Sequence, residues 1–274
     1  MKKGLILVLV LAVTMVAGLG VLSQPAGAEQ QLVIATGGTA GTYYPLGGAL
    51  AQIFNSKVKN VNAIAQTTGA SVENVRLIGK KEVDIAFVQN DITDYAYNGE
   101  EVFKEKLANF GVMASLYPEI VQIVVSADSN IKSVADLKGK KVSVGAAGSG
   151  VEANARQILN AYGLTYKDIS PNFLSFAESA DQFKDKHLDA IFVVAGAPTA
   201  AIQDISASRK VRILSIPRQM SEKIQKKYPF FSEITIPANT YSGQTEEVAT
   251  LAVRAMLIVR KDLDEGLVYN LTKA

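Results

Sequence analysis

The sequence contains no cysteine and no tryptophan, and it has one histidine, His187. The absence of cysteine excludes disulfides, thiolate metal ligands, cysteine nucleophiles and a lipid-modified cysteine anchor. A serine–histidine–aspartate triad would have to use His187, which lies in the charged run KDKHLD, and no G-x-S-x-G nucleophile motif accompanies it. A metal site could use only oxygen ligands, and no clustered set of them stands out. We therefore expect a protein that is not an enzyme and that holds no metal and no cofactor.

Long basic runs are also missing. Lysine pairs occur only at 80–81, 140–141 and 226–227 outside the first few residues. Nucleic-acid binding needs a basic face, so we expect no nucleic-acid partner. The two glycine-rich stretches do not fit nucleotide motifs either. Neither ends in Gly-Lys-Ser/Thr, and GAAGSG at 145–150 lacks the order G-x-G-x-x-G.

Residues 1–28 have the pattern of a cleaved secretory signal. Lys2 and Lys3 precede an apolar run that reaches about Leu22, and a small-x-small triplet ends at Ala28. The alternative is an uncleaved N-terminal anchor, since the run is long enough to span a bilayer. We favour cleavage after Ala28, which predicts an extracytoplasmic protein with no stable membrane insertion and, without the two signal lysines, a net charge near zero.

After Ala28 the pattern alternates between short apolar runs and amphipathic segments. Such alternation predicts an α/β fold with a mainly parallel sheet that helices cover. The helix expected over 150–162 places Val151, Ala155, Ile158 and Leu159 on one face. Strands are expected at 32–36, 61–66, 84–88, 111–115, 120–126, 141–145, 189–195 and 211–216, and further helices at 71–78 and 198–206.

The stretch 34–48, IATGGTAGTYYPLGG, organises this pattern, because a strand runs through a glycine loop into a helix. We expect Gly37, Gly38 and Gly41 to adopt positive φ, and Thr39 and Thr42 to add hydroxyls at the helix start. A helix N-terminus with free N–H groups suits an anion. The alternative is a tight turn that binds nothing.

The second half repeats this plan at 141–150, KVSVGAAGSG, which also leads into a helix. Ligands of open α/β sheets lie beyond the carboxyl ends of the strands. Two such halves facing each other would form a cleft with a helix N-terminus on each wall. The chain would cross between lobes near Tyr117-Pro118 and again near Tyr228-Pro229. The alternative is two independent α/β domains without a shared site.

Nine motifs follow one another along the chain after Ala28. They are ATGGTAGTYYPLGGALA (35–51), TTGASVENV (67–75), DIAFVQND (84–91), LYPEIVQIVV (116–125), ADLKGKKVSVGAAGSGVEANA (135–155), LSFAES (174–179), DAIFVVAGAPTAAI (189–202), YPFF (228–231) and IPANTY (236–241). Together they resemble the TAXI family, the solute receptors of TRAP (tripartite ATP-independent periplasmic) transporters, over the range 32–274. This resemblance implies a type II periplasmic-binding-protein fold with two lobes and a hinge. It implies as partners a small carboxylate, such as glutamate or a related amino acid or dicarboxylate, and a TRAP membrane permease driven by an ion gradient.

The expected lobes are 29–117 plus 229–274 for the first and 118–228 for the second. Two departures from the family pattern stand out. Ala197 replaces a usual aromatic residue at the expected mouth of the cleft, and family members continue beyond Ala274 with helices that complete the first lobe. We therefore expect the first lobe to be incomplete at its C-terminus. A receptor of an ABC importer or a ligand-sensing subunit of a signalling system remain as alternatives.

The residues expected to bind the ligand lie in the two glycine loops, at helix starts and at strand ends. Some have structural alternatives: Ser71 as a helix cap, Asn74 as a cap or backbone partner, and Asp91 as the cap of the following helix. The full set is Gly38, Thr39, Gly41, Thr42, Tyr43, Gly69, Ser71, Asn74, Gln89, Asp91, Ser149, Gly150, Val151 and Gly196.

Overall fold

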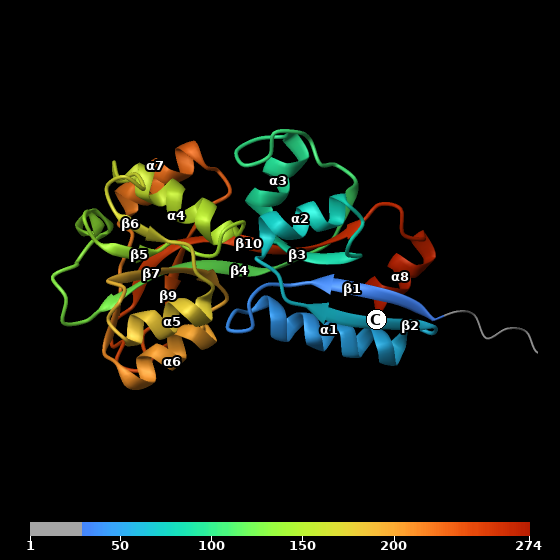
Figure 1. Ribbon diagram of the computed structural model, residues 1–274, viewed down its shortest axis with the longest axis horizontal. Coiled ribbons are helices and arrows are strands. Elements are labelled where there is room, and N and C mark those ends of the chain that lie inside the picture. The colour runs from blue at the N-terminus through green and yellow to red at the C-terminus, as the bar shows by residue number, and fades with distance from the viewer. Residues whose placement is uncertain (1–28) are drawn as a thin grey trace, which may run out of the picture.

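The computed structural model describes residues 29–274, so the expected signal segment and its cleavage after Ala28 lie outside the described residues. The chain forms two α/β lobes that lie side by side, joined by two long strands (Figure 1). The first lobe contains β1 (Gln30–Ala35), α1 (Tyr43–Lys57), β2 (Val61–Gln66), α2 (Ser71–Gly79), β3 (Ile85–Gln89), α3 (Asn90–Asn98) and α8 (Glu265–Lys273).

The second lobe repeats the order of the first. It contains a 3-10 turn (Val134–Leu137), β5 (Lys141–Ser143), α4 (Gly150–Ala161), β6 (Ser170–Asn172), α5 (Phe176–Lys184), β7 (Ala190–Ala195), α6 (Ala200–Ser208), β8 (Val211–Ile213), α7 (Arg218–Lys227) and β9 (Ser232–Ile236). In the first lobe β1 pairs in parallel with β2 and β3, and in the second β5 pairs in parallel with β6 and β7. The parallel pairing expected from the sequence is therefore confirmed for these three strands of each lobe, whereas the remaining strand pairings are antiparallel.

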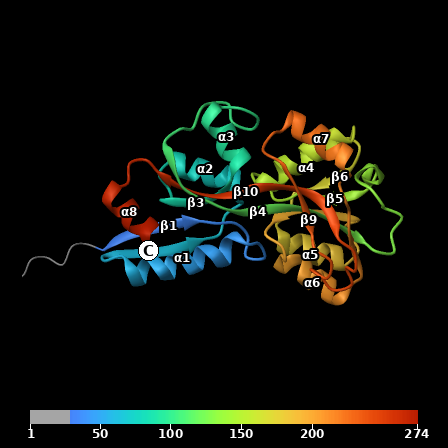
Figure 2. The same ribbon diagram turned by 180° about the vertical axis from the view of Figure 1, so that it is seen from behind.

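Two antiparallel strands, β4 (Phe110–Ser126) and β10 (Val248–Arg260), pass from one lobe to the other (Figures 1 and 2). The strands expected at 111–115 and 120–126 are parts of this single strand β4. Pro118 lies opposite Arg254, and the register shifts between Arg254 and Met256. A proline removes a backbone donor and a bulge bends the strand, so the ladder is weakest where it crosses between lobes. The crossing expected at Tyr117-Pro118 falls at this point.

The second crossing lies further along the chain than the sequence indicated. Residues 229–253 belong to the second lobe, because β9 pairs with the first half of β10 and because Phe231 and Val253 pack into second-lobe cores. Ala255 is the first β10 residue in a core of the first lobe. The expected boundary at 228/229 is thus displaced by the β9–β10 hairpin, which keeps the chain on the second sheet for another two dozen residues or so.

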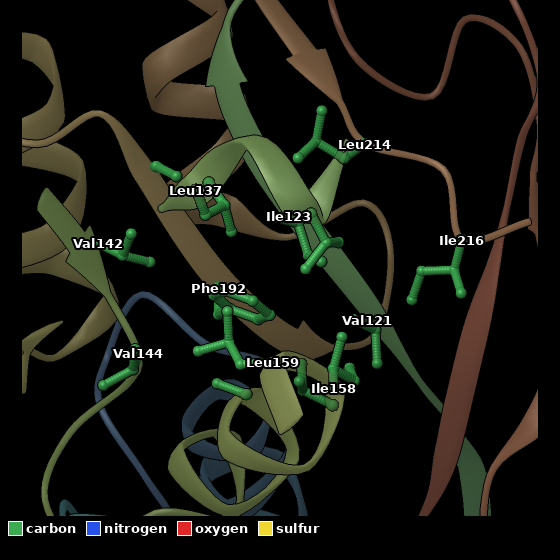
Figure 3. Close-up of a cluster of buried hydrophobic side chains, with 14 of the residues drawn as sticks. Val121, Ile123, Leu137, Val142, Val144, Ile158, Leu159, Phe192, Leu214 and Ile216 are labelled. Carbon is green, nitrogen blue, oxygen red and sulfur yellow. The ribbon is translucent and has the colours of Figure 1, made fainter. Parts of the chain in front are cut away.

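Each lobe has an apolar core on both faces of its sheet. In the first lobe α1 covers one face and α2 with α3 the other, and in the second lobe α4 with α7 and α5 with α6 do the same (Figure 1). Figure 3 shows the core beneath α4, where Ile158 and Leu159 lie beside Phe192 of β7. The whole face predicted for this helix, Val151, Ala155, Ile158 and Leu159, packs into this core. The described helices include none long and apolar enough to cross a bilayer.

Candidate functional site

A cavity of about 70 Å³ lies between the two lobes, and residues of both lobes line it. The first lobe contributes its first two helix starts and the end of β3, and the second contributes the equivalent elements. Glu119 of β4 lines the cavity beside the crossing. The lining residues are Gly37, Gly38, Gly41, Thr42, Tyr43, Thr68, Gly69, Ala70, Ser71, Gln89, Glu119, Ala146, Ser149, Gly150, Val151, Ser175, Phe176, Val194 and Ala195.

Four helices begin at this cavity: α1, α2, α4 and α5. The first N–H groups of each helix have no partner within the helix, and the helix dipole adds positive potential there. The two lobes differ in whether a side chain caps these N–H groups. Ser149 caps α4 and Ser175 caps α5 by accepting from Glu152 N–H and Glu178 N–H, whereas no side chain caps α1 or α2. The start of α2 is partly satisfied from the other lobe, because Glu73 N–H donates to Gly148 carbonyl. The other first N–H groups of α1 and α2 have no capping side chain and can bind an anionic group.

The glycine conformations differ from the sequence expectation. Gly37, Gly38 and Gly41 do not have positive φ; positive values occur at Gly145 and Gly148 in the second glycine loop and at Ala70, just before α2. At Gly145, with φ of +92°, a Cβ would lie 2.7 Å from Val151 Cβ, so a side chain there would strain the backbone and clash. Gly41 has a different role: Phe176 of the other lobe lies so close that a side chain at position 41 would have little room.

The structure gathers ten of the expected site residues around this one cavity. They come from both glycine loops, from the start of α2 and from the end of β3, as the repeated strand–loop–helix plan implied. Ser71 is the first residue of α2 and accepts from Gln89 N–H at 3.2 Å, so it does not cap the helix. The ten residues are Gly38, Gly41, Thr42, Tyr43, Gly69, Ser71, Gln89, Ser149, Gly150 and Val151.

The other four expected residues do not line the cavity. Thr39 is exposed at the turn. Asn74 is fully buried and donates to Thr36 and Phe87 carbonyls at 2.7 Å each, so it holds two strand ends together. Asp91 lies in the first turn of α3, and Gly196 packs against the Thr42 side chain. The side chains of Asn74 and Asp91 bond to other groups of the protein, which sequence spacing alone does not reveal.

Glu119 is the one acidic residue of the cavity wall, and it is not among the residues expected from the sequence. It is 2% exposed, and Tyr43 OH donates to its Oε2 at 2.9 Å. Burial raises the pKa of Glu119 to about 8, against the opposing effect of hydrogen bonds from Tyr43 and Gln89. The wall contains no lysine, arginine or histidine. Across the described residues no group of three or more acidic or histidine side chains could hold a metal ion.

Gln89 reaches across the cleft from the end of β3. A Cβ at position 150 would overlap Gln89 Oε1, so only glycine at the start of α4 lets this amide approach. Gln89 is 2% exposed, and its Oε1 has no hydrogen-bond partner among the described residues. A buried acceptor without a donor is unfavourable, so this atom marks a place where a ligand donor is missing.

Further polar contacts hold the lobes together around the cavity. Glu73 N–H donates to Gly148 carbonyl at 3.1 Å. Deeper along the interface, Asn154 Nδ2 of α4 donates to Asp91 Oδ2 of α3 at 2.7 Å. Burial raises the pKa of Asp91 to about 6. An ion pair between Arg156 and Glu101, with 3.0 Å between Nη1 and Oε2, closes the outer edge. These contacts join the two lobes, so the structure is a closed form.

Two signals in the sequence could have found the missed residues. Glu119 follows the expected crossing at Tyr117-Pro118 by one residue, and a side chain beside a crossing strand lies between the lobes. Ser175 begins a capping box with Glu178, which marks a helix start equivalent to Ser71 in the repeated plan. Phe176 follows Ser175 and lies at the same helix start.

The two similar lobes, with a cavity between them, have the type II periplasmic-binding-protein fold. Solved structures with this fold are similar to the chain. They include the alkanesulfonate-binding protein SsuA from Xanthomonas axonopodis pv. citri bound to MOPS, with a TM-score of 0.52 and 16% identity over 86% of this chain and 67% of that one. The arginine-bound form of truncated ArgBP from T. maritima has a TM-score of 0.54 and 12% identity over 89% and 93%.

A binding protein component of an ABC phosphonate transporter from Pseudomonas aeruginosa has a TM-score of 0.51 and 11% identity, over 89% of this chain and 73% of that one. The chain spans 61% of the length of the aliphatic sulphonate binding protein SsuA from Escherichia coli. A family model described as the NMT1-like family matches residues 34–274. The chain belongs to the NMT1-like family.

Proposed function

We propose that the protein is an extracytoplasmic solute receptor that captures a small carboxylate between its lobes and delivers it to a TRAP-type membrane permease. The observation that carries this proposal is the convergence of four helix N-termini on one cavity between the lobes, where no side chain caps the starts of α1 and α2. These groups can bind a carboxylate without a basic side chain. Glutamate, a related amino acid or a dicarboxylate fits this chemistry.

The lobes open and close about the crossing in β4 and β10. A ligand that touches both walls binds the closed form better than the open one and therefore shifts the population toward it. Ser149 and Gly150 on one wall and Thr42 and Tyr43 on the other supply such a double contact. The open form would give the solute a path in and out, and the closed form is the state that a permease would recognise.

The TRAP assignment rests on the motifs that resemble TAXI receptors. A receptor of an ABC importer is the second candidate, since a structure with the same fold is a component of an ABC phosphonate transporter. Uptake by cells that co-express the neighbouring permease genes separates the two. Collapse of the ion gradient stops TRAP uptake, and depletion of ATP at a maintained gradient stops ABC uptake. A histidine kinase encoded in place of a permease would indicate a sensing subunit.

The direct test of solute capture is a thermal shift of the purified protein against amino, dicarboxylic and keto acids. A ligand at about 100 times its Kd stabilises the folded state by about 2.7 kcal/mol, which raises the Tm by roughly 5–10 °C for a chain of this size. We expect such a shift with at least one acid and none with the matching amide or alcohol. A cooperative melt that no acid displaces would refute a carboxylate receptor.

A further inference from the structure

Two buried polar side chains of the cavity wall carry hydrogen-bond acceptors. They are those of Glu119 and Gln89, and both are almost fully buried. Tyr43 donates to one carboxylate oxygen of Glu119, but Gln89 Oε1 accepts from no described group. Gln89 lines the cavity, and its Oε1 is packed against Gly150, so a ligand donor would have to enter beside the start of α4 to reach it.

A compensating positive charge is also missing beside these two side chains. The groups that face Glu119 are Tyr43 on α1, Tyr117 on its own strand and Asp91 on α3, and none of them is a cation. The nearby start of α4 contributes Gly150, and no lysine, arginine or histidine lines the cavity. A buried carboxyl with no cation and an amide oxygen with no donor lie together, so one positively charged N–H group would satisfy both.

We propose that Glu119 and Gln89 form an ammonium subsite, so that the cavity selects a zwitterion, a small acid that also carries a primary amine, over acids without one. This inference rests on the proposed function, since the uncapped starts of α1 and α2 would hold the carboxylate of the same ligand. The ligand class is thereby narrowed from carboxylates in general to amino acids. Gly150 is part of the subsite because only a glycine leaves room for Gln89.

Proton release follows from this arrangement. Burial raises the pKa of Glu119 to about 8, so the carboxyl of the ligand-free protein is mostly protonated at pH 7. An ammonium group beside it favours the carboxylate and lowers its pKa. Binding at pH 7 should therefore release about 0.9 proton per ligand, the fraction protonated at one pH unit below the pKa. An acid that lacks an amine would leave Glu119 protonated and release none.

The test is calorimetry with matched pairs: L-glutamate, L-aspartate and L-alanine, each against its 2-hydroxy acid. Titrations at pH 7 in two buffers of different ionisation enthalpy give the number of protons released. At least one amino acid should bind 100-fold or more tightly than its partner, with release of about 0.9 proton. Glu119→Gln should bind the amino acid at least tenfold more weakly, leave the hydroxy acid nearly unchanged and release no proton. The matched control Glu247→Gln, at an exposed loop position, should behave as the native protein.

The outcomes separate this inference from the proposed function. Equal binding of both members of every pair, or unchanged binding of the amino acid by Glu119→Gln, would overturn the ammonium subsite and leave the carboxylate receptor standing. Preference for the hydroxy acid with proton uptake would also overturn it, because Glu119 would then donate to an anion. Failure of every acid to bind would refute the receptor itself. The proton count on the native protein decides the question even where Glu119→Gln does not fold.

Discussion

Replacement of Glu119 by glutamine should make the ligand-free protein more stable at high pH. In the native fold the Glu119 carboxyl keeps its proton until about pH 8, whereas in the unfolded chain it loses the proton near the ordinary value of 4.5. Between these values the folded state holds more protons, so its stability falls as the pH rises. The stabilising contribution of the protonated form is complete below pH 4.5 and is lost as the pH rises through 8.

The size of this effect follows from the same two values. Each pH unit in the window removes up to about 1.4 kcal/mol, and the loss between pH 6 and pH 8 comes to about 2 kcal/mol after the approach to the native pKa is allowed for. Glutamine has no proton to lose and keeps an oxygen for Tyr43 OH. The native protein should therefore lose about 2 kcal/mol relative to Glu119→Gln over this range.

Urea unfolding at intervals from pH 6 to pH 8.5, without ligand, measures the effect. The difference in unfolding free energy between the two proteins removes the contribution of Asp91, whose pKa of about 6 both share. With a slope of about 3 kcal/mol per molar urea, the midpoints should separate by roughly 0.7 M across the range. The unfolding free energy of Glu247→Gln should vary with pH as that of the native protein does. Parallel curves for Glu119→Gln would refute the argument, since they would mean that this carboxyl titrates as it does in water.

Two further substitutions test the closed interface. Gly150→Ala should weaken ligand binding at least tenfold in calorimetry, because the new Cβ overlaps Gln89 Oε1. The control Gly48→Ala, where no atom lies within 4 Å of the added Cβ, should leave ligand binding unchanged. Unchanged ligand binding by Gly150→Ala would contradict the closed geometry. Asn154→Ala leaves Asp91 buried without its donor. The lobes of the ligand-free protein should therefore open, and its radius of gyration in X-ray scattering should rise. An unchanged radius would show that this contact does not hold the lobes together.

The sequence predicted the lobes better than their boundaries. Alternating apolar runs and the repeated strand–glycine–helix plan placed the parallel strands and the cavity-facing helix starts close to where they lie, because these features depend on local periodicity. The boundary near Tyr228 failed for a different reason. β9 and β10 form an antiparallel hairpin on the second lobe, and only the pairing partner of β10 decides which lobe a residue joins.

In the candidate site, too, the features set by local sequence could be predicted and those set by distant contacts could not. Backbone features such as the starts of α1 and α4 could be placed from glycine and hydroxyl residues. Side-chain roles could not, because they depend on contacts between distant segments. Asn74 donates to the carbonyl of Thr36, which is 38 residues away in the sequence. Asp91 accepts from Asn154, which is 63 residues away. Neither partner can be identified from a local motif.

Glu119 shows how far local reasoning could have gone. An acid within an apolar strand is ordinarily an edge or surface residue, so the run LYPEIVQIVV directs attention to the valines and isoleucines. A strand that crosses between two lobes differs, because a side chain beside the crossing can face the cleft as well as a core: Glu119 lines the cavity, whereas the next residue, Ile120, packs into a second-lobe core. Pro118 marks the crossing, and Glu119 is the next residue. A hinge expected at Tyr117-Pro118 therefore makes Glu119 a candidate for the cleft, and the proposed ammonium subsite would make this carboxyl the link between ligand choice and pH.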